Sequence, residues 1–167
     1  MNFTAAVITV SDSCAKGERE DLSGAVVASL LSAAGYIIAE RAIVPDEIAQ
    51  IRTALLACTD ADPSLQPAVQ LVVTTGGTGI TARDVTPEAT LPLCEKLLTG
   101  IAELIRLEGR AQTPLAALSR ALCGTRRQSL ILNLPGSPQG AVASLKIALP
   151  LLRHALELLA GNTRHPG

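Results

Sequence analysis

The chain has 167 residues, of which 48% are hydrophobic but only 1% aromatic, and its formal net charge at pH 7 is −1. This length predicts a single domain, residues 1–167, with a core built mainly from Leu, Val, Ile and Ala. The lack of a basic charge balance argues against a protein that binds duplex nucleic acid. The scarcity of aromatic side chains argues against one that stacks single-stranded bases.

The first third of the chain alternates strand and helix patterns. Thr4–Val10 is an apolar run rich in Val and Ile, which predicts a buried strand. Apolar residues recur at helical spacing over Leu22–Ala34, and Gly35 then suits the end of a helix. Tyr36–Val44 predicts a second strand, and a helix is predicted over Pro45–Ala57.

The same alternation continues beyond a polar stretch. Thr59–Pro67 contains two prolines and predicts a surface loop, and Val69–Thr75 predicts the third strand. Thr86–Glu88 carries the residues of a helix start: a capping residue, a proline and an acidic residue. Glu103–Arg110 predicts another helix, and Ser129–Leu134 a further strand.

The final helix is predicted to begin at Ser137–Pro138. Its Leu- and Ala-rich part, Ala141–Ala160, contains four ionisable residues and Pro150, so a buried or interface helix is expected rather than a membrane span. It is apolar on more than one face, which predicts an oligomer.

The predicted strands are continuous apolar runs and alternate with helices. This pattern indicates a mostly parallel sheet covered by helices on both faces. The four cysteines contain no CxxC pair, and the N-terminus lacks the basic region of a signal peptide. A cytoplasmic protein with reduced thiols is therefore expected.

Three polar turns directly follow predicted strands: 11–13, 75–79 and 135–137. Ligands bind beyond the carboxyl ends of parallel strands, so these turns are expected to converge at one edge of the sheet. The second turn carries Gly76, Gly77 and Gly79, whose backbone amides could approach a phosphate. It matches neither the P-loop nor the dinucleotide-binding fingerprint, and a tight strand-to-helix connection is the alternative interpretation.

Asp46 and Asp84 lie beside these turns. Each has a structural interpretation, Asp46 as the N-cap of a helix and Asp84 as an Asx turn with Thr86. Together they could hold Mg²⁺, which takes one or two carboxylates plus substrate phosphates.

The two histidines, His154 and His165, are remote from every motif, which argues against triad hydrolysis and a histidine zinc site. Phosphoryl or nucleotidyl transfer fits better, because a phosphate nucleophile is already ionised and needs no base. Positive charge could come from four arginines, each of which could equally be a solvated surface residue: Arg83, Arg106, Arg110 and Arg120.

Thr74–Thr90, which reads TTGGTGITARDVTPEAT, resembles the signature of the bacterial molybdopterin adenylyltransferases. Further stretches agree with that family, so the resemblance spans nearly the whole chain: Thr9–Ser13 with Asp21–Gly24, Val44–Glu47, Leu118–Arg120 and Leu132–Pro138. It departs from the family at Ile101, where relatives often carry an aromatic residue.

The resemblance implies a three-layer α/β/α sandwich, usually trimeric, that uses ATP, molybdopterin and Mg²⁺ to make adenylyl-molybdopterin and pyrophosphate. It implies catalysis, and Mg²⁺ binding, by Asp46 and Asp84. It places these residues at the substrate site: Ser11, Asp12, Thr75, Gly76, Gly77, Thr78, Gly79, Ser119, Arg120, Pro135, Gly136 and Ser137. Other molybdenum cofactor biosynthesis proteins would be partners. Two alternatives are a non-catalytic pterin-binding relative and a nucleotide pyrophosphatase.

Overall fold

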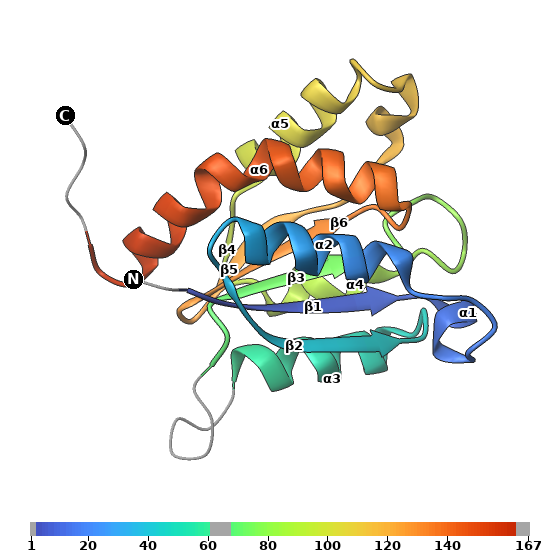
Figure 1. Ribbon diagram of the computed structural model, residues 1–167, viewed down its shortest axis with the longest axis horizontal. Helices are drawn as coiled ribbons and strands as arrows, with labels where there is room; N and C mark the ends of the chain where they lie inside the picture. The colour runs from blue at the N-terminus through green and yellow to red at the C-terminus, as the bar shows by residue number, and fades with distance from the viewer. Residues whose placement is uncertain (1–2, 61–67, 163–167) are drawn as a thin grey trace.

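The computed structural model, which describes residues 3–60 and 68–162, is built around one six-stranded sheet (Figure 1). The strands lie in the order β2-β1-β3-β6-β5-β4. Four run parallel: β2 (Ile37–Val44), β1 (Thr4–Val10), β3 (Leu71–Thr75) and β6 (Ser129–Leu134). Two at one edge pair antiparallel: β5 (Cys123–Arg126) and β4 (Lys96–Leu97). The predicted strands and the mostly parallel sheet are confirmed.

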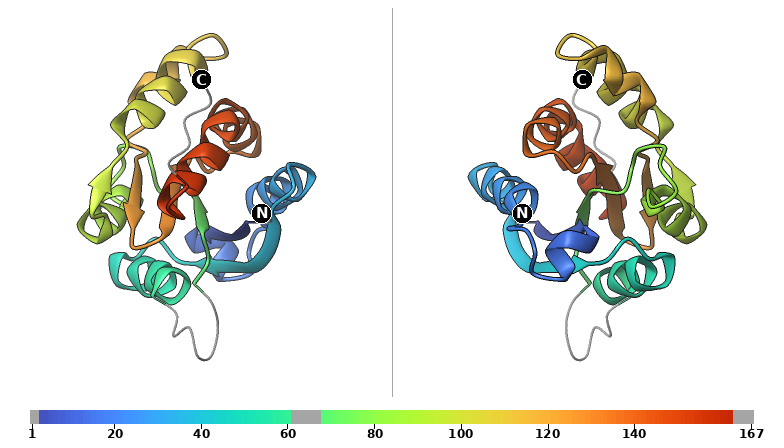
Figure 2. Two further views of the ribbon diagram at one scale, coloured as in Figure 1. Left: turned by 90° about the vertical axis from the view of Figure 1, so that its left-hand side faces the viewer. Right: turned by 90° about the vertical axis from the view of Figure 1, so that its right-hand side faces the viewer.

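Helices cover both faces of this sheet (Figure 2). One face carries α2 (Leu22–Ala33), α5 (Thr99–Gly109) and α6 (Pro138–Leu159), and the other carries α3 (Ile48–Thr59) and α4 (Thr86–Thr90). The register aligns Val7, Val73 and Leu132 across three strands, and all three are buried under the first group of helices. Ile8 and Ile131 point to the other core, because side chains alternate along a strand. The structure is therefore the expected three-layer sandwich.

Several boundaries differ from the predictions. The helix predicted from Pro45 begins at Ile48, with Glu47 as its N-cap. α5 begins at Thr99 rather than Glu103, so the predicted helix lacked the first turn, whose Ile101 and Ala102 are buried. The strands β4 and β5 were not predicted, since one has two residues and the other contains Gly124. Three short helices were also missed: α1 (Asp12–Ala15), η1 (Leu91–Leu93) and η2 (Pro114–Leu118).

Two expectations about particular segments need correction or restriction. Ile101 is buried in the core under α5 and lines neither of the two pockets described below, so the departure from the family there does not alter a wall of either. Of the predicted loop Thr59–Pro67, Thr59 ends α3, and residues 61–67 lie outside the described part of the chain.

The last helix presents one buried stripe to the sheet and leaves apolar side chains on another face. The stripe consists of Ala141, Leu145, Ala148, Leu152 and Leu156. Leu151 and Leu158 remain 41% and 40% exposed. None of the described helices combines the length and hydropathy that crossing a bilayer requires.

The four cysteines are all free, as predicted. Burial raises the pKa of the Cys58 and Cys123 thiols to about 12. Both thiols therefore stay protonated at neutral pH and behave as small core side chains.

Candidate active site

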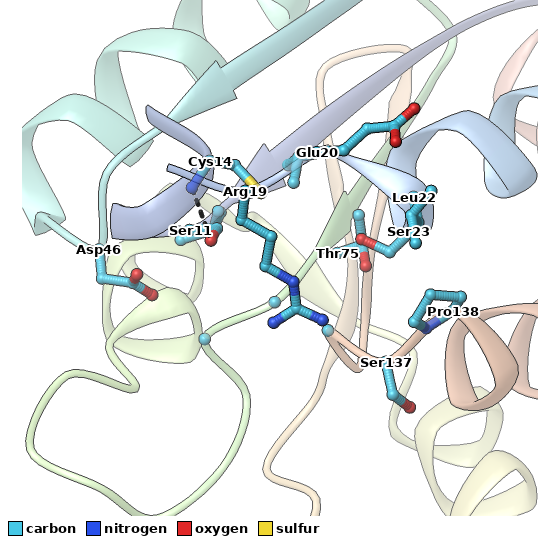
Figure 3. A pocket seen from close by; sticks show the side chains of 15 residues that line it. Ser11, Cys14, Arg19, Glu20, Leu22, Ser23, Asp46, Thr75, Ser137 and Pro138 are labelled. Atoms are coloured by element: carbon cyan, nitrogen blue, oxygen red, sulfur yellow. Dashed lines mark hydrogen bonds between the residues drawn. The ribbon is translucent and has the colours of Figure 1, made fainter. Parts of the chain in front are cut away.

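The three predicted polar turns converge at the carboxyl edge of the parallel strands. They border a pocket of about 310 Å³, here called the polar pocket, together with the turn after β2 and the stretch that leads into α2 (Figure 3). A second pocket of about 540 Å³, the α5–α6 pocket, is lined by residues of the glycine loop, α5, η2 and α6, with Ile80, Ile105, Leu115 and Leu118 among its apolar side chains. Gly77, Gly136 and Ser137 belong to both pockets.

The predicted site residues divide between the two pockets. Ser11, Asp46, Thr75 and Gly76 line only the polar pocket. The α5–α6 pocket alone is lined by Thr78, Gly79, Asp84, Ser119 and Pro135. Asp12 and Arg120 line neither of them.

The glycines of the loop meet a packing requirement inside the protein. Gly76 has φ of 105°, and a Cβ there would lie 2.1 Å from the Val10 carbonyl oxygen. Gly77 has φ of 65°, and its Cβ would lie 2.3 Å from Thr86 Oγ1. The Thr86 amide and hydroxyl donate to the carbonyls of Gly77 and Gly76. The alternative interpretation of the loop, a tight strand-to-helix connection, is therefore correct. A Val side chain in place of Gly77 would clash there, so a Gly77→Val variant is not expected to fold.

The same loop also presents free hydrogen-bond donors. The backbone amides of Gly77 and Thr78 have no acceptor within residues 3–60 and 68–162, and neither has that of Gly136. Thr78 is buried and Gly77 half-buried, and amides in such places normally have partners, so the two donors left open at a pocket favour an anionic ligand.

Asp46 is held in the polar pocket by a reciprocal pair of hydrogen bonds and not by capping a helix. Its Oδ2 accepts the Asp12 amide at 2.8 Å, and its own amide donates to Asp12 Oδ1 at 3.1 Å. The predicted N-cap role is therefore wrong. Among the described residues Asp46 Oδ1 has no hydrogen-bond donor, and it faces Gly77, since a Cβ on that residue would lie 3.2 Å away.

Arg83 fixes Asp12 and through it the position of Asp46. Its Nε and Nη2 each donate to an oxygen of Asp12 at 3.0 Å, and its Nη1 donates to Glu47 Oε1 at 2.9 Å. The hydrogen bond from Arg83 lowers the pKa of Asp12. Burial, aided by the neighbouring Asp12 carboxylate, raises the pKa of Asp46.

Asp84 closes a turn with Thr81 rather than with Thr86. Its Oδ2 accepts the Thr81 amide at 2.8 Å and the Thr81 hydroxyl at 2.7 Å. Burial alone would raise the pKa of Asp84, but these hydrogen bonds and one from the Gly79 amide lower it overall. Asp84 is therefore an ionised group at the wall of the α5–α6 pocket.

Arg120 braces the glycine loop from outside the two pockets. Its Nε donates to the Gly79 carbonyl at 2.7 Å, its Nη2 donates to the Asp84 carbonyl at 2.6 Å, and its guanidinium pairs with Glu88 on α4. Its amide donates to the Thr78 carbonyl. Every one of these contacts is internal, so Arg120 positions the loop, and its substrate-binding role stays a prediction.

Eight lining residues of the polar pocket were missed by the sequence reasoning: Thr9, Val10, Cys14, Arg19, Glu20, Leu22, Ser23 and Pro138. Four of them come from the polar stretch that runs from α1 to the first turn of α2: Cys14, Arg19, Glu20 and Ser23. A signal was present, because the polar stretch follows the first of the three turns and is rich in charge. Nothing in its local pattern shows that the chain folds back over the strand ends.

The carboxylates of the site are chemically suitable ligands for Mg²⁺. Asp46 offers an oxygen without a protein donor, and Mg²⁺ binds through one or two carboxylates with substrate phosphates and water completing its shell. In the described parts of the chain, no group of three or more His, Cys, Asp or Glu residues gathers as a self-sufficient metal site.

Comparisons with known proteins agree with this geometry. Residues 6–154 match the family described as the probable molybdopterin binding domain. The chain is 39% identical over 160 residues to the molybdopterin adenylyltransferase of Helicobacter pylori strain J99, covering 93% of this chain and 87% of that protein. It is 37% identical to the molybdopterin adenylyltransferase of Pyrococcus furiosus, covering 93% and 92%. The crystal structure of the molybdopterin biosynthesis enzyme MoaB from Thermus thermophilus has a TM-score of 0.87 and 43% identity, covering 95% of this chain and 97% of that one.

Proposed function

Because the chain belongs to the family of the probable molybdopterin binding domain, we propose that it is a molybdopterin adenylyltransferase. It transfers AMP from ATP to the terminal phosphate of molybdopterin and releases pyrophosphate. The observation that carries the proposal is the pair of adjoining pockets that share Gly77, Gly136 and Ser137. A transfer between two substrates requires two ligands held with their reacting groups at a common boundary.

The reaction needs little from the protein beyond position and charge. An oxygen of the molybdopterin phosphate attacks the α-phosphorus of ATP, a new P–O bond forms, and the bond to the pyrophosphate oxygen breaks. The attacking oxygen is already ionised, so no general base is required. The free amides of Gly77 and Thr78 donate to phosphate oxygens and hold them at the boundary.

Asp46 and Asp84 would hold Mg²⁺, which when bound neutralises phosphate charge during the transfer. Asp12 and Arg83 keep the Asp46 carboxylate in one orientation, and Arg120 keeps the Gly79–Asp84 segment against α4. We further propose that the protein works as a homotrimer, in keeping with the exposed apolar face of α6.

The test is to incubate the protein with ATP, Mg²⁺ and molybdopterin and to look for adenylylated pterin and pyrophosphate by mass spectrometry. A parallel reaction without molybdopterin should leave ATP intact. Hydrolysis of ATP in that control would favour the nucleotide pyrophosphatase. Binding of molybdopterin without any adenylylated product would favour the non-catalytic relative.

A further inference from the structure

Arg19 is the one cationic residue that lines the polar pocket within the described chain. It lies in the stretch between α1 and α2, and its side chain extends into the middle of the pocket between Asp46 and Ser137 (Figure 3). Among the described residues its guanidinium has no hydrogen bond and no ion pair. An arginine with five donors aimed into a pocket and no protein acceptor is available for a ligand.

The other arginines around the site are already engaged. Arg83 is paired with two carboxylates, and Arg120 with one carboxylate and two backbone carbonyls. Arg106 donates to the carbonyls of Ser119 and Ala121. Among the described side chains that line the polar pocket, Arg19 is therefore the one that offers positive charge to a ligand.

The remaining charges of the polar pocket are negative. The lining contains two carboxylates, Asp46 and Glu20, and the Arg19 guanidinium offsets their charge beside whatever a cation bound at Asp46 would contribute. The same pocket is lined by Ser11 and Ser137, which carry hydroxyls, and by Gly77 and Gly136, whose amides are free within the described chain. All of these groups can donate hydrogen bonds to phosphate oxygens. An arginine guanidinium can do the same with two parallel donors, so the pocket as a whole suits a phosphate.

We propose that Arg19 is a substrate-binding residue that donates to phosphate oxygens in the polar pocket. The ligand chemistry is a phosphate or diphosphate group, supplied either by ATP or by molybdopterin. The inference takes the two candidate ligands from the proposed function but depends on no catalytic step. No sequence motif pointed to this role, because Arg19 lies outside every motif and precedes the cap residue Asp21 by two positions.

The test compares Arg19→Gln and Arg19→Lys with Lys16→Gln as a matched control. Lys16 lies on the same exposed stretch and loses the same charge when replaced, but it does not line the pocket. Dissociation constants are measured by calorimetry for inorganic pyrophosphate, for a non-hydrolysable ATP analogue and for molybdopterin. Circular dichroism verifies that each variant keeps its fold.

Arg19→Gln is expected to weaken pyrophosphate binding and binding of at least one substrate by about 10- to 100-fold, the loss of a charge-assisted contact. Arg19→Lys should lose less, since it keeps the charge but not the bidentate geometry. Alongside the weaker pyrophosphate binding, a loss of affinity for only one of the two substrates, the ATP analogue or molybdopterin, identifies whose phosphate Arg19 holds. Pyrophosphate affinity retained within about twofold, or an equal loss in Lys16→Gln, overturns the proposal.

Because these are binding measurements, their outcome is separate from that of the transfer assay. An Arg19→Gln variant that loses phosphate affinity supports the inference even if no adenylylated pterin is ever found. If the wild-type protein is active and its Arg19→Gln variant binds every probe normally, the proposed transferase function stands and the proposed role of Arg19 is refuted.

Discussion

Replacing Asp46 by Asn is expected to abolish adenylyl transfer while leaving the fold intact. The Asp12 amide donates to one oxygen of the Asp46 side chain at 2.8 Å. In the variant this donor selects the amide oxygen of the new asparagine as its acceptor. The side-chain NH₂ then takes the place of Oδ1, the oxygen without a protein partner, and presents a donor where a cation would bind.

The stability of this variant follows from two opposing effects. The hydrogen bond from Asp12 loses its ionic character, which is destabilising. The neutral side chain also no longer suffers the burial and the repulsion from Asp12 that raise the pKa of Asp46, which is stabilising. The melting temperature should therefore stay within about 3 °C of wild type, as for a surface substitution in a chain of this size.

Activity should fall by about 100-fold or more, the scale of losing one preorganised electrostatic contact. Turnover is measured across a Mg²⁺ titration, with molybdopterin affinity as a second readout that should change little. Glu18→Gln is the matched control, because it removes a negative charge from the exposed stretch beside the polar pocket, and Glu18 lines neither pocket. A stable Asp46→Asn variant with wild-type turnover would refute the assignment of Asp46.

Three other outcomes are expected. Asp84→Asn should lose activity to a similar degree, and its melting temperature should also fall by about 2–6 °C. The reason is that one side-chain oxygen is replaced by a donor, which faces amides that donate to Asp84 in the wild type. An unchanged melting temperature contradicts this prediction. The hydrogen bond from Arg126 lowers the pKa of Asp60 below 3.8. The ionised Asp60 carboxylate therefore stabilises the folded protein above that pH, and this stabilisation is lost as the pH falls through the lowered pKa. Thermal melts of Asp60→Asn should accordingly show a lower melting temperature at pH 7 and a weaker acid dependence than wild type. Light scattering should report a trimer, and Leu151→Glu with Leu158→Glu should shift it toward monomer; a monomeric wild type at micromolar concentration would end that expectation.

The fold was predictable because its main signals are local. Thr4–Val10 and Ser129–Leu134 are short, mostly apolar runs rich in Val, Ile and Leu, which is typical of buried strands in a parallel sheet. The edge strands β4 and β5 gave no comparable signal. Lys96–Leu97 has no period to detect, and its pairing with Gly124 and Thr125 depends on a contact distant in sequence.

The site was predictable only where its residues follow strands. The rule that parallel strands end at one edge located Ser11, Thr75 and Ser137 without any knowledge of the structure. The rule cannot reveal partners that come from elsewhere. The Asp12–Asp46 exchange and the position of Arg19 depend on how two connections fold over the edge, and the internal use of Arg120 depends on where α4 lies.

The place of β6 in the sheet has a consequence for how the protein is made. It lies between β3 and β5, yet among the strands of the described residues it comes last in sequence. A nascent chain that ends before Ser129 holds two separate pieces of sheet, β2-β1-β3 and β5-β4, whose facing edges have unpaired backbone groups. Because the Pro135–Ser137 turn follows β6, neither pocket is complete until this strand has inserted. The sheet can therefore be completed only after β6 has been synthesised, and the open edge of β3 is the surface that needs protection meanwhile.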